Sequence, residues 1–266
     1  MKAIVCVKQV PDTQGKVAVK PDGTMDRSKM ATITNPDDLN ALEAALKLKD
    51  ETGCEVVVVT MGPPPAAGML REVGARGADR CVLVSGREFG GSDTFATSLI
   101  LAAAVNKIGV GPEEVVFCGR QAIDGDTAQV GPQIAEKLEI PQVSYVADIK
   151  KEGNTLTVRR MLEDGYMTVQ VQTPCLLTCI KELNEPRYMS IGGIYSTYNK
   201  PLELYDYAKL KDHPLIDATT IGLKGSPTNI FKSFTPPQKG VGQMLEGDGK
   251  ETCEKLVEIL TAKHII

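Results

Sequence analysis

The chain has 266 residues, which is enough for one large domain, or a domain with substantial appendages, and for a sizeable hydrophobic core. Its 30 Lys and Arg residues nearly balance 34 Asp and Glu residues, so the formal net charge of −4 gives no sign of a nucleic-acid partner. The first apolar run is too short for a signal peptide and no later run approaches a membrane span, so we expect a soluble, cytoplasmic protein with no membrane insertion.

The residues that build common catalytic and metal sites are sparse or unsuitably spaced. The seven cysteines include no C-x-x-C pair and several lie in apolar runs, which indicates buried free thiols. The two histidines, His213 and His264, have no metal-type pattern around them. The chain also lacks a P-loop motif and has no G-x-G-x-x-G after its first apolar run. These observations argue against P-loop hydrolysis and a dehydrogenase-type Rossmann site.

The first 140 residues alternate between apolar runs and helical segments. The apolar runs are rich in Val and Cys and show little period-two alternation, as is typical of strands covered on both faces. We expect strands at residues 3–7, 55–61, 80–85 and 115–118. The pattern therefore predicts an α/β fold with a parallel sheet.

The first predicted helix follows Asn35 and Pro36, because Asn is a favoured cap and Pro suits the first helical position. Its buried stripe is predicted from the apolar residues at three- and four-residue spacing, which are Leu39, Leu42 and Leu46. This stripe leaves Glu43, Lys47 and Lys49 on the solvent side. A second helix is predicted over residues 65–73.

A third helix is predicted to open within residues 90–97 and to continue to residue 108, with Ser92 or Asp93 as its cap. The glycine pair before it would let a ligand approach closely, and Thr94 and Thr97 share one helix face. The alternative is an ordinary helix start with no ligand role.

Residues 119–132 form a glycine-bearing turn between a predicted strand and a helix predicted over residues 133–138. Unpaired N–H groups at the positive end of a helix dipole readily hold an anion such as a phosphate. The alternative is a structural turn with Asp126 or Thr127 as the cap. Asp124 and Asp126 suit magnesium, backbone amides or ribose hydroxyls equally well.

The pattern changes after residue 141. Residues 143–149, 155–160 and 167–172 predict antiparallel strands joined by short turns, and residues 174–180 predict another strand. A long irregular stretch then extends to about residue 248, as an arm lying on another polypeptide or as a flexible tail. Residues 251–263 predict an amphipathic helix.

Four predicted connections lie beyond the carboxyl ends of strands, where open parallel sheets bind ligands. They are residues 6–8, 61–63, 90–97 and 119–130. Their convergence predicts a nucleotide cradle assembled from several strand ends.

Several segments resemble the β subunit of electron transfer flavoprotein, in the expected order over nearly the whole chain. They are residues 5–12, 35–38, 77–79, 119–126, 158–178 and 183–188. The resemblance implies a parallel-sheet nucleotide-binding domain of the adenine-nucleotide-hydrolase-like type, with an antiparallel hairpin extension and a long C-terminal arm. It implies a domain over residues 1–190, and a recognition segment, arm and helix over residues 191–266 that contact the α subunit.

The resemblance further implies a heterodimer with an α subunit that carries FAD. In the respiratory branch the β subunit holds structural AMP. In the electron-bifurcating branch it holds a second FAD that accepts hydride from NADH and passes electrons to the α-subunit FAD and to ferredoxin or flavodoxin, with an acyl-CoA dehydrogenase as a further partner. Gly125 and Thr127, residues 90–97 and residues 10–13 favour the bifurcating branch. A self-contained nucleotide-processing enzyme is the remaining alternative, and no catalytic motif supports it.

The resemblance assigns no catalytic or metal residue. The positions that it assigns to the cofactor are Cys6, Asn35, Met61, Asp93, Thr94, Thr97, Ala122, Ile123, Asp124, Gly125, Asp126, Thr127, Gln129 and Val130. We expect Cys6, Asn35 and Met61 around the adenosine. Asp93, Thr94 and Thr97 are expected nearer the flavin. The recognition segment includes Tyr188, Met189, Ile191 and Ile194, which either dock a redox partner or pack on the chain's own core.

Overall fold

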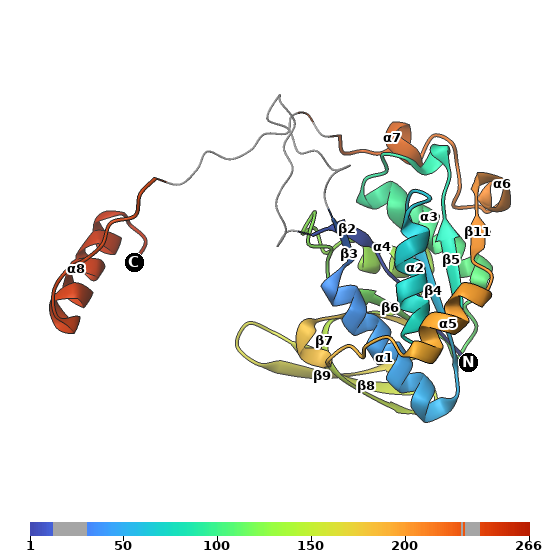
Figure 1. The fold of residues 1–266 in the computed structure, drawn as a ribbon, viewed down its shortest axis with the longest axis horizontal. Helices are drawn as coiled ribbons and strands as arrows, with labels where there is room; N and C mark the ends of the chain where they lie inside the picture. The colour runs from blue at the N-terminus through green and yellow to red at the C-terminus, as the bar shows by residue number, and fades with distance from the viewer. Residues whose placement is uncertain (13–30, 230, 232–239) are drawn as a thin grey trace. The chain divides into compact units, whose positions relative to one another are not determined.

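The computed structural model describes residues 1–12, 31–229, 231 and 240–266 (Figure 1). The described residues up to Phe231 belong to one compact unit, and residues 240–266 belong to a second. Thr13, which is part of one segment quoted for the bifurcating branch, and residues 232–239 of the predicted arm lie outside the described residues.

Nine strands of the described residues form one sheet, in the order β11-β5-β4-β1-β6-β10-β7-β8-β9 (Figure 1). The strands are β1 (Lys2–Cys6), β4 (Glu55–Met61), β5 (Arg80–Val84), β6 (Val115–Gly119), β7 (Gln142–Glu152), β8 (Thr155–Met161), β9 (Tyr166–Gln172), β10 (Cys175–Cys179) and β11 (Glu203–Tyr205). Pairing is parallel from β11 to β7 and antiparallel in the β7-β8-β9 extension. The predicted parallel sheet with an antiparallel extension is confirmed.

Helices cover both faces of the parallel part of this sheet, as the continuous apolar runs predict. The helices α1 (Pro36–Thr52) and α2 (Ala66–Ala75) cover one face, where Val5 and Phe117 pack in the same cluster as Leu42. The helices α3 (Thr94–Ile108) and α4 (Val130–Lys137) cover the other, where Ile4 packs in the same cluster as Ile100. Successive strand residues therefore point to different cores.

Helix α1 begins at Pro36 as predicted and ends before Gly53, whose φ of 71° lies in the left-handed region that glycine favours. Leu42 and Leu46 are buried as predicted. The solvent-facing prediction for Glu43 is wrong, because only 5% of this residue is exposed. A later segment of the chain covers the side of α1 that the helical pattern predicted to face solvent.

The stretch predicted as irregular contains several short elements. They are α5 (Ile191–Asn199), β11, α6 (Tyr207–Leu210) and α7 (Gly222–Gly225). Strand β11 pairs in parallel with β5, and Arg80 of β5 forms an ion pair with Glu203 at 2.7 Å. The boundary expected at residue 190 therefore lies inside the first compact unit. These elements are too short to have a clear periodic pattern.

Two small features complete the first unit. The strands β2 (Gln9–Pro11) and β3 (Thr32–Thr34) form an antiparallel pair that leads directly into α1. Two 3₁₀ turns span Arg87–Phe89 and Lys181–Leu183.

The described part of the second unit contains helix α8 (Gly249–Ala262). Asp248 caps it by accepting hydrogen bonds from the backbone N–H groups of Lys250 and Glu251. Leu256 and Val257 are exposed, and no residue of the helix is buried within the chain. No helix among the described residues has the length and apolarity needed to cross a membrane.

Candidate functional site

The candidate site lies where the carboxyl ends of β1 and β6 meet. Cys6 and Cys118 are paired neighbours on these two strands. The chain leaves β1 toward β4 on one side, whereas β6 lies on the other side of β1. Open α/β sheets bind ligands at such a switch in strand order. The loop from residue 120 to residue 129 joins β6 to α4 at this point.

The first turn of α1 holds the ends of both strands through Asp38. One carboxylate oxygen, Oδ2, accepts a hydrogen bond from the Lys8 N–H at 2.8 Å, and Oδ1 accepts one from the Gly119 N–H at 3.0 Å. Burial raises the pKa of Asp38 to about 7, although its hydrogen bonds act in the opposite direction. A Cβ at position 119 would lie 2.3 Å from Asp38 Oδ1, so this contact requires glycine.

Asn35 holds the loop from the same end of α1. Its side chain is fully buried; Nδ2 donates to the Gln121 carbonyl at 2.8 Å, and Oδ1 accepts from the Ile123 N–H at 3.1 Å. Asn35 occupies the cap position of α1, as predicted, but its side chain makes no cap hydrogen bond. Both polar atoms of the Asn35 side chain bond to the loop instead.

The middle of the loop has an unusual backbone. Asp126 and Ala128 have φ values of 51° and 53°. These values lie in the left-handed region, which residues other than glycine rarely adopt. Gln121 Nε2 donates to Asp126 Oδ1 at 2.7 Å. Helix α4 starts three residues before the predicted position, and neither Asp126 nor Thr127 caps it. The cap predictions for these two residues are therefore wrong.

The loop offers unpaired donors to a ligand. Backbone bonding within it ends where Asp126 donates to the Ala122 carbonyl, and it resumes where Gln133 donates to Gln129. Among the described residues, the N–H groups of residues 127–131 between these points have no hydrogen-bond partner. They precede or begin an α-helix, whose dipole favours an anion there. This arrangement fits a phosphate-bearing nucleotide.

Two side-chain contacts join the loop to its neighbours. Lys8 forms an ion pair with Asp124 at 2.7 Å, and both side chains are partly exposed. Thr94 Oγ1 donates to Gln129 Oε1 at 3.0 Å, which connects the start of α3 to the loop. The structure therefore brings the two predicted ligand segments, residues 90–97 and 119–130, together.

Asp93 caps α3 as predicted, since one carboxylate oxygen accepts from the Ala96 N–H at 3.0 Å. Its other oxygen accepts from the Thr228 N–H at 2.9 Å, and its own N–H donates to Ser226 Oγ at 2.8 Å. We call these contacts of Asp93 with Ser226 and Thr228 the clasp. The Asp93 carboxylate is thus occupied by the chain itself, whereas Thr94 and Thr97 are half-buried beside it.

Three further predicted positions, which we call the apolar floor, belong to one hydrophobic cluster or pack against it. Cys6 belongs to the cluster on the α3 and α4 face of the sheet, and Met61 and Val130 pack against it. A hydrogen bond with Cys6, followed by burial, raises the pKa of Cys118. All seven cysteines lie among the described residues and are free, as predicted. The floor is therefore uncharged.

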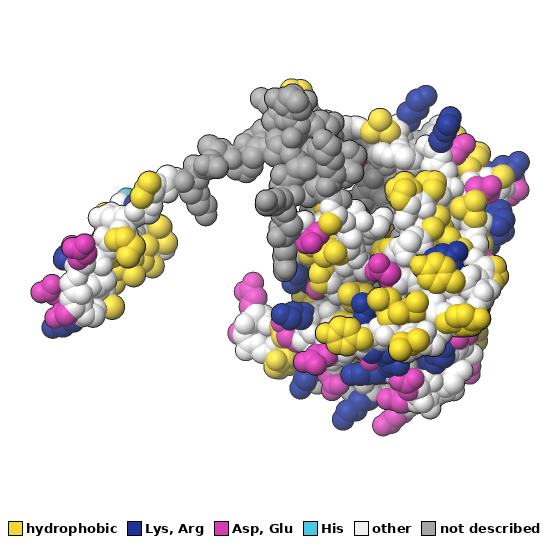
Figure 2. Space-filling view, viewed as in Figure 1, with side chains coloured by type: hydrophobic (Ala, Val, Ile, Leu, Met, Phe, Trp, Pro, Cys, Tyr) yellow, Lys and Arg dark blue, Asp and Glu magenta, His cyan; other side chains and the backbone are white. Residues whose placement is uncertain are grey.

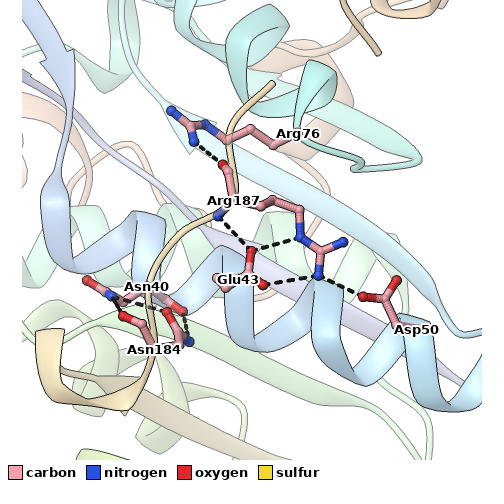
Figure 3. A network of polar contacts seen from close by, with 6 residues as sticks. All are labelled: Asn40, Glu43, Asp50, Arg76, Asn184 and Arg187. Carbon is pink, nitrogen blue, oxygen red and sulfur yellow. Dashed lines mark hydrogen bonds and ion pairs between the residues drawn. The ribbon is translucent and has the colours of Figure 1, made fainter. Parts of the chain in front are cut away.

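A second polar network fixes the segment before α5 to the middle of α1 (Figure 3). The Arg187 guanidinium donates to both oxygens of Glu43, at 2.9 and 3.0 Å, and to Asp50 at 2.7 Å. Asn40 Nδ2 donates to the Asn184 carbonyl at 2.7 Å. Arg76 donates to the Arg187 carbonyl.

Beyond this network, the predicted recognition residues are exposed. Tyr188 is 92% exposed and Ile191 is 89% exposed, so neither packs on the core. Met189 and Ile194 are also exposed. Helix α5 adds two exposed aromatic residues, Tyr195 and Tyr198. The sequence prediction did not include these tyrosines.

Three polar residues that hold the site were not named among the cofactor positions, although residues 8 and 121 lie in the predicted connections 6–8 and 119–130. They are Lys8, Asp38 and Gln121. An acid in the first turn of a helix is ordinary dipole compensation, so Asp38 carries no sequence signal of its own. Its one distinguishing feature is its place in the segment 35–38, which was noted for the family resemblance.

The fold is that of an α/β protein whose candidate site lies at the carboxyl ends of parallel strands. Residues 22–209 match the electron transfer flavoprotein domain. The acryloyl-CoA reductase electron transfer subunit gamma of Anaerotignum propionicum is 67% identical over 267 residues, covering 100% of both chains. The caffeyl-CoA reductase-Etf complex subunit CarD of Acetobacterium woodii is 53% identical, and an electron transfer flavoprotein subunit beta of Clostridium acetobutylicum is 49% identical, each with 100% coverage of both chains. The chain belongs to the electron transfer flavoprotein family, as a β-subunit member.

Proposed function

We propose that this chain binds an adenine nucleotide at residues 119–131 within an electron transfer flavoprotein heterodimer, and that the nucleotide is FAD in an electron-bifurcating complex. The observation that carries the proposal is the row of N–H groups at residues 127–131 with no partner among the described residues, on a loop whose side chains are exposed or half-buried. Two relatives named after CoA reductases support the bifurcating assignment.

The residues of the site have distinct roles in this proposal. The N–H groups of residues 127–131 hold the pyrophosphate, and Asp124 and Asp126 accept hydrogen bonds from sugar or ribitol hydroxyls. Cys6 and Met61 provide the apolar surface for the adenosine, while Thr94 and Thr97 orient the flavin portion. A bound FAD would supply hydride acceptance from NADH and one-electron transfer to the α-subunit FAD and to ferredoxin or flavodoxin.

The partners follow from the exposed surfaces and the relatives. Figure 2 shows hydrophobic side chains gathered over α2 and α5, where Tyr188, Ile191 and Tyr195 are exposed. We assign this face to a redox partner, which in the named complexes is a CoA reductase. An acyl-CoA dehydrogenase is the corresponding partner class for this chain. We assign α8, with Leu256 and Val257 exposed, to the α subunit.

Flavin stoichiometry tests the central proposal. The full-length chain is co-expressed with its α subunit, and FAD and AMP are counted in the purified heterodimer after denaturation. Two FAD molecules per heterodimer are the expected result. One FAD and one AMP would instead establish the respiratory type, in which electrons pass only through the α-subunit FAD.

Gly125 provides a sharper test of the loop. A Cβ at this position would have no heavy atom within 4 Å, so the fold tolerates a side chain there. Gly125→Asp places a carboxylate in the loop, and we expect loss of the β-site flavin with an unchanged melting temperature. Gly125→Ala is the matched control and should retain the flavin. Full flavin content in G125D would contradict the assignment of this loop.

The assignment of α8 has its own test. Deleting the residues after Gly240 should weaken co-purification with the α subunit, because it removes the exposed apolar face of α8. The first unit should keep its unfolding transition. A truncated chain that co-purifies and transfers electrons as the full chain does would overturn the assignment.

A further inference from the structure

We propose that Asp38 and Asn35 are the positioning residues of the nucleotide loop: they shape the loop through hydrogen bonds to its backbone. This inference rests on the proposed function and extends it to residues at the start of α1. Asn35 was expected beside the adenosine, and the proposal gives its side chain the further role of holding the loop backbone.

The first support is the saturation of both side chains. Asn35 is 0% exposed, and its two polar atoms bond to the backbone of Gln121 and Ile123. Asp38 is 6% exposed, and its two oxygens bond to the backbone of Lys8 and Gly119. The polar atoms of both side chains are therefore bonded to the backbone of the strand ends and of the loop.

The second support is the location of these four backbone groups. Lys8 and Gly119 lie at or just beyond the carboxyl ends of two adjacent strands, and Gln121 and Ile123 form the first part of the loop. One helical turn thus fixes four points along the two chain segments that border the crevice. The strained residues, Asp126 and Ala128, follow directly. The hydrogen bonds from α1 therefore fix the backbone that leads to these two residues.

The third support is the chemistry of the acceptors. Both N–H groups that meet Asp38 need an oxygen acceptor, and a carboxyl group presents two oxygens whether or not it is protonated. An Asn side chain presents one oxygen and one NH₂ group. Asp38→Asn therefore leaves one buried N–H facing another donor, and the end of β1 or the start of the loop must move.

Glu43→Gln is the matched control. Glu43 lies on the same helix, is 5% exposed, and holds Arg187 instead of the nucleotide loop. The same acid-to-amide change is thus made twice on α1, in equally buried places with different partners. A general loss of stability in α1 would affect both variants alike.

The experiment measures hydrogen exchange and nucleotide affinity in the full-length chain bound to its α subunit. In D38N we expect exchange in residues 119–130 to accelerate, and the Kd for FAD or AMP to rise by about tenfold, as for one lost buried hydrogen bond. In E43Q we expect faster exchange at residues 184–199 with the nucleotide Kd unchanged. Unchanged loop exchange and unchanged Kd in D38N would overturn the proposal, as would equal effects of E43Q on the loop.

A second variant covers failure of D38N to fold. Asn35→Asp removes the Nδ2 donor to the Gln121 carbonyl, and the same two readouts apply: loosening of the loop with weaker nucleotide binding supports the proposal, and no change overturns it. A wild-type complex that binds neither FAD nor AMP would remove the proposed function. The exchange comparison between D38N and E43Q would still decide whether Asp38 shapes the loop.

Discussion

Helix α1 holds two other segments of the chain in different ways. At its first turn, Asn35 and Asp38 bond to backbone groups of the nucleotide loop and its borders. At its middle, Glu43 meets a charged side chain, that of Arg187, in addition to the Arg187 backbone N–H. The loop is thus held by residues outside the loop, whereas the segment before α5 contributes a charged side chain to its own attachment.

The largest expected effect concerns the titration of the first anchor. Burial raises the folded-state pKa of Asp38 from 3.8 to about 7, so the folded chain holds this proton more tightly than the unfolded chain. Its contribution to stability is complete below about pH 4 and is lost as the pH rises through about 7. Relative to Asp38→Asn, the wild-type unfolding free energy should fall by several kcal/mol over this window.

Urea denaturation of both proteins at a series of pH values measures this difference. Parallel pH profiles for wild type and D38N would show that Asp38 titrates in the fold as it does in the unfolded chain. The two anchors would then not differ in the cost of their buried acids.

The next largest effect concerns packing at the first anchor. A Cβ on Gly119 would lie 2.3 Å from Asp38 Oδ1 and 2.7 Å from the Asp38 nitrogen. Gly119→Ala should therefore cost about 3 kcal/mol of unfolding free energy, in the range of overpacked cores. Gly125→Ala, in open space on the same loop, should change it by less than about 0.5 kcal/mol. Equal stability of the two variants would refute the close approach of α1 to β6.

The smallest effect concerns the second anchor. Glu43→Gln removes the charge that faces Arg187, and should cost about 1–2 kcal/mol of unfolding free energy. Asp50→Asn removes the other carboxylate, whose side chain is 59% exposed, and should cost less than about 0.5 kcal/mol. Chemical denaturation checks both values. A larger loss in D50N than in E43Q would reverse the order of the two contacts.

Much of the fold could be predicted from local pattern. The four N-terminal strands of the parallel sheet appear as uninterrupted Val-rich runs because both of their faces are buried. The start of α1 was marked by Asn35 and Pro36, and the start of α3 by Asp93. The loop after Gly119 was recognisable because a glycine-bearing turn followed a buried strand.

What could not be predicted depends on contacts across long sequence separations. Asp38 and Glu43 are acids at positions where a helix can equally well face water, and Gly119 and Arg187 bury them from 81 and 144 residues away. Asn35 stands at a typical cap position, yet its side chain bonds to the distant loop and not to the helix. Strand β11 has three residues, too few for any periodicity, and joins the sheet through its pairing with β5.

The clasp has a mechanical consequence. Ser226 and Thr228 are hydrogen-bonded to Asp93. These bonds attach the described end of the first unit, just before Phe231, to the start of α3. A pull exerted on the chain beyond this point acts first on the cap of α3, before it reaches any strand of the sheet. Thr94, which follows that cap, is hydrogen-bonded to Gln129, so two consecutive residues connect the clasp to the loop between β6 and α4.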